Sequence, residues 1–155
     1  MYGTGHNSKN GENRQVKFRE STQADIDALK GRSISRGIMK RQQERNEYCY
    51  TLEHKGEVLV IGGIRMINNI SAWAWVDISI DAQPRMRTVY RAIKEWMEII
   101  VKEKGIIRLQ AYIEPDFPEA IRMIQHLGFE KESILEYFLP KGDAYLYRRI
   151  FKENI

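Results

Sequence analysis

The chain is built from short segments in which apolar and polar residues alternate, and from longer segments in which apolar residues recur every three or four positions. The first pattern is typical of strands with one buried face, and the second of amphipathic helices. Strands are predicted at residues 16–19, 48–52, 57–66, 71–80, 106–113, 131–139 and 144–151. Helices are predicted between Thr22 and Gly31, over residues 33–45, from Pro84 to Gly105, and from Pro118 to Gly128.

The order β-α-α-β-β-β-α-β-α-β-β predicts one α/β (α+β) domain over residues 16–155. We expect a central mixed, twisted sheet of about six to seven strands flanked by about four helices. The helix that leads into strand 106–113 implies a parallel neighbour for that strand. Gly62 and Gly63 inside strand 57–66 predict a bulge or a close backbone approach. Residues 1–15 are polar and rich in glycine, which predicts a flexible N-terminal arm.

Composition narrows the class of protein. Hydrophobic residues make up 43% of the chain, enough for a packed core. One cysteine, Cys49, excludes an internal disulfide, and the scarcity of Cys and His disfavours a structural metal site. We find no apolar run long enough to cross a membrane. These features are those expected of a protein made in a reducing cytoplasm.

Positive charge is concentrated in the first third of the chain. Residues 1–50 contain ten Lys or Arg against six Asp or Glu, whereas residues 51–155 contain fifteen of each. Arg36, Lys40 and Arg41 lie on the predicted helix 33–45, so this helix is a candidate surface for a protein partner, together with the arm. No nucleic-acid motif accompanies these charges, and nucleic acid is not the expected partner.

The segment 120–129 (AIRMIQHLGF) begins a helix with alanine and ends it with Gly-Phe. In that pattern and in its order of elements, the chain resembles the GNAT (N-acetyltransferase-like) superfamily. It is most similar to GNAT-like proteins of bacteriophages, of the internal virion protein A type found in short-tailed phages. That similarity covers residues 61–63, 72–73, Trp96, 108–112, 116–120, 127–129 and the hairpin 137–147. The resemblance implies a GNAT fold and a bacterial host cytoplasm. For some members it also implies a place in a phage particle, where the arm and the basic helix would contact other virion subunits.

The same resemblance places a phosphate-binding turn after the fourth strand, where GNAT enzymes carry Arg/Gln-x-x-Gly-x-Gly/Ala and bind the pyrophosphate of acetyl-CoA through backbone N–H groups. The turn here is 81–90 (DAQPRMRTVY), which contains no glycine. Arg85, Met86, Arg87 and Thr88 are the candidate cofactor-binding residues, because two arginines at a helix start attract an anion. Pro84 removes one N–H from the turn.

Two further positions depart from the GNAT pattern. Phe117 replaces an asparagine that often precedes the late helix, and Ile124 replaces a tyrosine that often protonates the CoA thiolate. An isoleucine cannot donate a proton. Both departures, with the missing glycines, argue against standard acetyl transfer.

On the fourth strand, Trp73, Trp75, Asp77 and Ser79 share one face. Asp77 is the candidate general base for an amine, or else a carboxylate paired with a neighbouring arginine. Trp73 and Trp75 are candidate partner-binding residues, or else packing residues. An open cleft between the fourth and fifth strands would favour an enzyme, whereas Trp73, Trp75 or Tyr112 filling it would favour a binding module.

The sequence therefore leaves several hypotheses. The leading one is a non-catalytic binding or structural module of phage type, with a degenerate acetyl-CoA motif and a place in or on a virus particle. The alternative is an acetyl-CoA-dependent N-acyltransferase that acts on an amine through a divergent pyrophosphate-binding turn. A third is a protein that binds another anionic ligand without catalysis.

Overall fold

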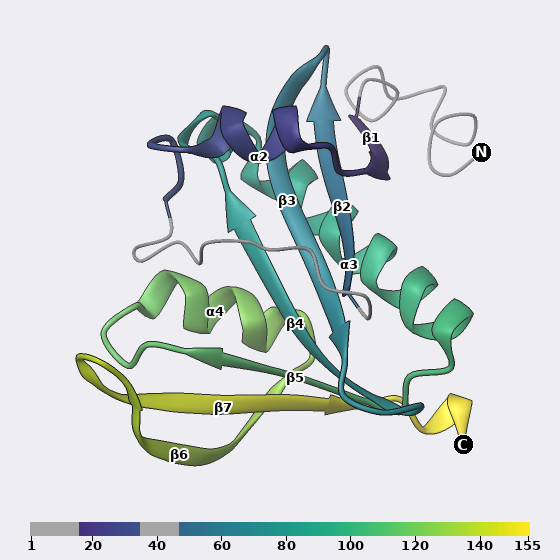
Figure 1. Cartoon of the computed structure of the whole chain (residues 1–155), viewed down its shortest axis with the longest axis vertical. Coiled ribbons are helices and arrows are strands. Elements are labelled where there is room, and N and C mark those ends of the chain that lie inside the picture. The colour runs from purple at the N-terminus through teal and green to yellow at the C-terminus, as the bar shows by residue number, and fades with distance from the viewer. Residues whose placement is uncertain (1–15, 35–46) are drawn as a thin grey trace. The chain divides into compact units, whose positions relative to one another are not determined.

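The structure is a computed structural model that describes residues 16–34 and 47–155 (Figure 1). Its strands are β1 (Val16–Glu20), β2 (Glu47–His54), β3 (Glu57–Met66), β4 (Ser71–Ile78), β5 (Arg108–Ile113), β6 (Glu130–Leu139) and β7 (Gly142–Ile150). Its helices are α2 (Gln23–Leu29), the 3-10 helix η1 (Ile80–Arg85), α3 (Met86–Lys104), α4 (Pro118–His126) and the 3-10 helix η2 (Lys152–Asn154). The predicted order is confirmed within these ranges. The predicted arm 1–15 and nearly all of the predicted helix 33–45 lie outside the described residues.

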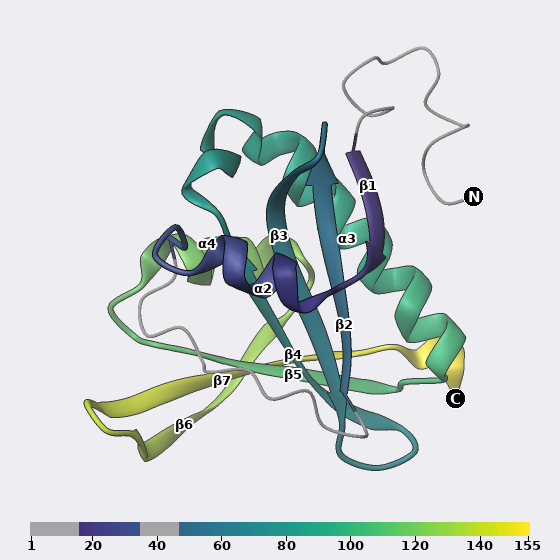
Figure 2. The same cartoon turned by 45° about the horizontal axis from the view of Figure 1, so that its top comes forward.

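The seven strands form one mixed sheet in the order β1-β2-β3-β4-β5-β7-β6. β4 and β5 pair in parallel, with Ser71 opposite Arg108 and Trp73 opposite Gln110, which confirms the predicted parallel neighbour. β2 pairs with β1 and β3, and β7 with β5 and β6, all in antiparallel fashion. Figure 2 shows β5 and β7 running side by side. The predicted mixed α/β sheet is therefore confirmed.

The chain divides into two compact units. The first contains the described residues up to Arg65 together with Trp75–Glu98, and the second contains Met66–Ala74 and Ile99–Ile155. β4 and α3 each contribute residues to both units.

In the first unit, Trp96 of α3 is the centre of an aromatic core. Its ring stacks on Phe18 with centroids 5.7 Å apart, and meets Tyr50 edge to face at 5.3 Å. It is only 6% exposed. Gly62 lies under this ring, since a Cβ added there would be 3.5 Å from the indole. The helical period read from the sequence is thus explained by burial of one face of α3.

Gly63 shows the close backbone approach that the sequence predicts. A Cβ at this position would lie 2.2 Å from ring carbons of Trp75, a distance that no side chain tolerates. The bulge in this hairpin lies elsewhere, between Leu52 and Glu53 of β2. Glycine is therefore required where β3 passes beneath the Trp75 indole.

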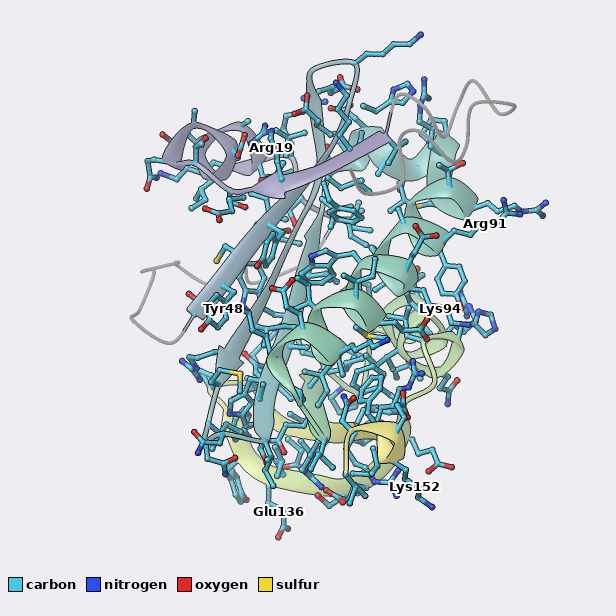
Figure 3. All side chains as sticks on the ribbon, turned by 90° about the vertical axis from the view of Figure 1, so that its right-hand side faces the viewer. Arg19, Tyr48, Arg91, Lys94, Glu136 and Lys152 are labelled. Atoms are coloured by element: carbon cyan, nitrogen blue, oxygen red, sulfur yellow. The ribbon has the colours of Figure 1, made fainter. Side chains whose placement is uncertain are left out.

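The start of α2 is fixed by a buried carboxylate. Thr22 and Asp25 form a capping box, in which each side chain accepts from the backbone N–H of the other. Asp25 also accepts two hydrogen bonds from the Arg19 guanidinium, at 2.7 and 2.9 Å, and one from the Thr51 hydroxyl at 3.0 Å. The Arg19 guanidinium, labelled in Figure 3, holds the pKa of Asp25 well below its usual range. This charge is structural, because groups of the chain itself surround it.

In the second unit, the end of α4 follows the pattern read from the sequence. Gly128 has φ +93°, a left-handed conformation that glycine adopts at helix ends. Phe129 follows and is 3% exposed. The Arg149 guanidinium donates to the carbonyl of Leu127 at 2.8 Å, and lies over the ring of Phe151 at 4.4 Å. These contacts hold the helix end against β7.

Candidate functional site

The segment that joins β4 to α3 is a 3-10 helix rather than an open turn. The sequence predicts that α3 begins at Pro84, whereas Pro84 lies inside η1 and α3 begins at Met86. Ser79 caps η1, because its hydroxyl accepts from the N–H of Asp81 at 3.1 Å. The N–H of Ala82 donates to the Ser79 carbonyl at 3.0 Å. Because Ser79 caps η1 five residues before Pro84, helical structure begins earlier than the sequence predicts.

The backbone donors of this segment are largely engaged within the chain. The N–H of Ile80 donates to the Arg32 carbonyl at 2.7 Å, and the N–H of Met86 donates to the Gln83 carbonyl. Pro84 has no N–H to offer. A glycine-rich phosphate turn presents free amides to its ligand. The amides of Ile80, Asp81, Ala82 and Met86 are instead bonded within the chain, so these four are not part of such a cradle.

The side chains at the same place offer positive charge. Arg85 is half-buried and Arg87 is exposed, and within the described residues neither guanidinium forms an ion pair. The first turn of α3 contains no acidic residue. Figure 3 shows the side chain of Arg91, one turn further on, extending outward from the helix. Cations at a helix N-terminus are repelled by the positive end of the helix dipole. An anion bound there would be attracted by both the arginines and the dipole.

The other two predicted cofactor-binding residues are less accessible. Thr88 is 8% exposed and Met86 is half-buried. Of the four residues that the sequence singles out, the two arginines are therefore the ones that present charge to solvent.

Asp77 lies near the end of β4 and is 8% exposed. The hydroxyl of Ser33 donates a hydrogen bond to its Oδ1. The sequence predicts that Asp77 is either a general base or a carboxylate paired with an arginine. The hydrogen-bond partner in the structure is a serine. Sequence reasoning missed Ser33, because forty-four positions separate it from Asp77 and it reads as the start of the basic helix.

Trp73 and Trp75 have separate neighbours. Trp73 packs edge to face on Tyr112, with centroids 6.1 Å apart, and stacks on Phe138 at 6.4 Å. Trp75 covers Gly63, and its Nε1 donates to Glu47 at 3.1 Å. Both indoles have the packing contacts that the sequence offered as the alternative to a partner surface.

The remaining sequence-based candidates are placed as follows. Arg36, Lys40 and Arg41 lie outside the described residues. Ile124 is 7% exposed on α4, and Phe117 precedes α4 without a side-chain capping bond. Among the residues that the structure describes, no group of three or more His, Cys, Asp or Glu side chains is arranged to hold a metal ion. No described helix has the length and hydropathy to cross a membrane.

By sequence, no known family model and no curated protein matches this chain. Solved structures match it clearly. The ribosomal-protein-S18-alanine N-acetyltransferase of Escherichia coli has a TM-score of 0.71 at 15% identity, over 87% of this chain and 93% of that one. A variant of the spermidine N-acetyltransferase SpeG of Vibrio cholerae gives 0.74 at 15% identity, over 91% and 96%. A second SpeG variant gives 0.75 at 14% identity, over 90% and 97%.

These likenesses extend over nearly the whole of each chain. Together with the order of strands and helices, they show that the chain has the GNAT fold, as the sequence predicts. At this level of identity they show the fold alone. The function depends on the residues of the site and not on the fold.

Proposed function

We propose that this protein is an acyl-CoA-dependent N-acyltransferase that acts on an amine. The fold is that of N-acetyltransferases, which favours the alternative read from the sequence over its leading hypothesis. The observation that carries the proposal is the charge pattern of one segment. Arg85 and Arg87, which form no ion pair with any described residue, stand at the start of α3. A buried carboxylate, Asp77, stands three residues before η1.

In this proposal the side chains take over the task that backbone amides perform in a glycine-rich turn. Arg85 and Arg87 would hold the phosphates, since guanidinium groups bind phosphate oxygens in bidentate fashion. Acetyl-CoA, when bound, supplies the activated acetyl thioester. Asp77 would accept a proton from the acceptor amine, so that the neutral nitrogen can form the new N–C bond as the thioester C–S bond breaks. Ile124 cannot protonate the leaving thiolate, so water would supply that proton.

A steady-state assay with acetyl-CoA and a panel of primary amines tests this proposal. The panel contains spermidine and a peptide with an N-terminal alanine, since structural neighbours act on such amines. We expect thiol release that depends on the amine, and a fall in kcat of about 10²-fold or more in Asp77→Asn, the range of general base catalysis. Glu57→Gln, an exposed carboxylate on β3, is the matched control and should leave kcat unchanged. No thiol release with any amine would contradict the proposal.

A second candidate is a non-catalytic binding module, and the occupied backbone amides of η1 favour it. The predicted arm 1–15 and the basic segment with Arg36, Lys40 and Arg41 would then contact a protein partner. Membership of a phage particle rests on the sequence resemblance alone. Failure of the protein to bind acetyl-CoA, combined with normal folding, would make this candidate the better one.

A further inference from the structure

Three aromatic rings from three different strands gather on one face of the second unit. Trp73 of β4 is opposite Gln110 of β5, so Tyr112, two residues further along β5, points to the same face as Trp73. Phe138 of β6 completes the group, because its ring centroid lies 4.9 Å from that of Tyr112 and 6.4 Å from that of Trp73. We call Trp73, Tyr112 and Phe138 the ring cluster.

The backbone of β6 leaves its regular pairing just where it contributes to the ring cluster. The register between β6 and β7 shifts between Leu135 and Leu139. Tyr137, inside this segment, has φ +53°, a left-handed conformation that is unusual for a bulky side chain. Its N–H donates to the Asp143 carboxylate at 3.0 Å, and its side chain is 89% exposed. The irregular segment thus brings Phe138 onto the sheet with local backbone strain, which is common at ligand sites.

The ring cluster is open to solvent but small. Phe138 is 45% exposed, and Trp73 and Tyr112 are half-buried. Further along the same face, two arginines are held by two glutamates, in the ion pairs Arg108–Glu132 and Arg148–Glu130. The apolar surface is therefore bounded by charged groups on this side, whereas a stable protein interface buries about 1,200–2,000 Å². The cluster fits a small ligand better than a folded partner.

The carboxylates beside the ring cluster exceed the cations that the structure places there. Asp143 binds the backbone next to Phe138, Glu136 lies two residues before Phe138, and neither carboxylate forms an ion pair with a described residue. Figure 3 shows the Glu136 side chain extending outward. Lys141, in the same hairpin turn, is paired with Glu114 at 3.0 Å. Because the faces of aromatic rings also attract cations, both features favour a positively charged ligand.

Other rings of the same hairpin already hold cations of the chain itself. The Lys131 ammonium lies 3.5 Å from the ring centroid of Tyr145, and the Arg149 guanidinium lies over Phe151. Tyr145 is opposite Ile113 of β5, one residue out of step with Tyr112, so its side chain points to the other face of the sheet. Contact between a cation and a ring is therefore a mode of packing that this unit uses away from the ring cluster.

We propose that the ring cluster binds a small free aliphatic ammonium ion. The hydrocarbon chain of the amine would pack on the exposed rings, and its positive charge would lie over a ring face and near Glu136 and Asp143. This inference goes beyond the proposed function, because no acyl group, no transfer step and no residue of the first unit enters it.

Calorimetric titration with n-hexylamine, which is protonated at pH 7, tests the site against 1-hexanol, a neutral ligand with the same hydrocarbon chain. We expect saturable binding of the amine and about three- to fivefold weaker binding of the alcohol, the range of an exposed cation–ring contact. Phe138→Leu removes a ring but keeps apolar bulk, and should weaken amine binding by a similar factor. Tyr145→Leu, on the other face, is the matched control and should leave it unchanged. Equal affinities for amine and alcohol, or equal losses in both variants, would overturn the proposal.

Nuclear magnetic resonance locates the binding and shows whether each variant is folded. On titration with n-hexylamine, the indole N–H signal of Trp73 should shift, whereas that of Trp96, buried in the first unit, should stay in place. Trp73→Phe identifies the first signal by its loss. Shifts at both indoles, or at neither, would overturn the ring cluster as the site.

The charge beside the cluster is tested separately. Glu136→Gln should weaken n-hexylamine binding about twofold, as expected for an exposed charge pair. Glu153→Gln, an exposed carboxylate of η2, should leave it unchanged. The same loss in both variants would contradict a local role for Glu136.

Two comparisons separate this inference from its neighbours. N-acetyl-lysine amide carries an ammonium group next to peptide groups and should bind no tighter than n-hexylamine. Tighter binding would mean that the ligand is a peptide, and would overturn the free amine. Amine binding without any acetyl transfer would contradict the proposed function alone, whereas acetyl transfer without amine binding at the ring cluster would overturn this inference alone.

Discussion

The end of α4 and the turn after β4 are two places where the GNAT pattern asks for glycine, and they differ in this chain. At the end of α4 the glycine is present: Gly128 adopts φ +93° and Phe129 is buried behind it. After β4 there is none, and the 3-10 helix η1 uses its own amides. The first glycine serves packing, whereas glycines in the second place would serve a phosphate ligand. The fold can therefore persist while the ligand chemistry changes.

If the α4 end is a packing site, removing its buried aromatic ring should have the largest effect on stability. We expect Phe129→Ala to lower the free energy of unfolding by about 3–5 kcal/mol, since it leaves a cavity in the core. Phe129→Leu should lose much less. Urea denaturation followed by circular dichroism measures both. A loss below about 1 kcal/mol for Phe129→Ala would show that this region does not anchor the fold.

A buried carboxylate that serves structure should behave differently from one that serves a site. We expect Asp25→Asn to lower the free energy of unfolding by about 2 kcal/mol at pH 7, because the Arg19 pairing is broken. The Arg19 guanidinium depresses the pKa of folded Asp25, so its contribution is present above pH about 4 and is lost as the pH falls below that value.

The pH dependence of unfolding is therefore the control for this residue. Wild-type stability should fall more steeply below pH about 4 than that of Asp25→Asn. Asp77→Asn should keep most of its stability at pH 7 and lose activity. Equal pH profiles for the wild type and Asp25→Asn would contradict the structural role of Asp25.

A smaller effect is expected at the helix end itself. Gly128→Ala should cost about 1–2 kcal/mol, because an L-residue is strained at positive φ. The added Cβ would also press on the Arg149 side chain at 3.2 Å. Thermal unfolding measures the change, and Gly56→Ala, another left-handed glycine with open space around it, separates backbone strain from the contact. A larger loss at Gly56 than at Gly128 would contradict the packing argument.

The smallest effect on stability should come from the turn after β4. Arg85→Ala/Arg87→Ala removes two cations from the start of α3, where they oppose the helix dipole, so stability should be unchanged or rise by about 0.5 kcal/mol. Chemical denaturation measures it. A loss above about 1 kcal/mol would mean that the arginines serve the fold, and the difference between the two regions would disappear.

The sequence predicts the parts of this molecule that depend on local period and on packing. The helical face with Trp96, the parallel neighbour of β5, the close approach at Gly63 and the end of α4 at Gly128 all follow from residue types a few positions apart. The structure confirms these predictions.

The site could be predicted only in part, because its contacts are long-range. Pro84 is compatible with the first turn of an α-helix and with a 3-10 turn, and the Ser79 cap decides between them. The Ser33–Asp77 bond joins residues far apart in the chain, and nothing in the local pattern marks it. The absence of glycine at 81–90 shows that the standard phosphate turn is missing. It does not show that a 3-10 helix, η1, forms there and uses its backbone amides in hydrogen bonds within the chain.

Calorimetric titration with acetyl-CoA, and with CoA alone, tests the central claim that the arginines after β4 hold an acyl-CoA. We predict a micromolar Kd for the wild type, weakened at least tenfold in Arg85→Ala/Arg87→Ala, with Lys152→Ala, an exposed cation of η2, unchanged. No heat at millimolar ligand from a folded wild-type protein would contradict the account and leave the GNAT fold here as a binding module.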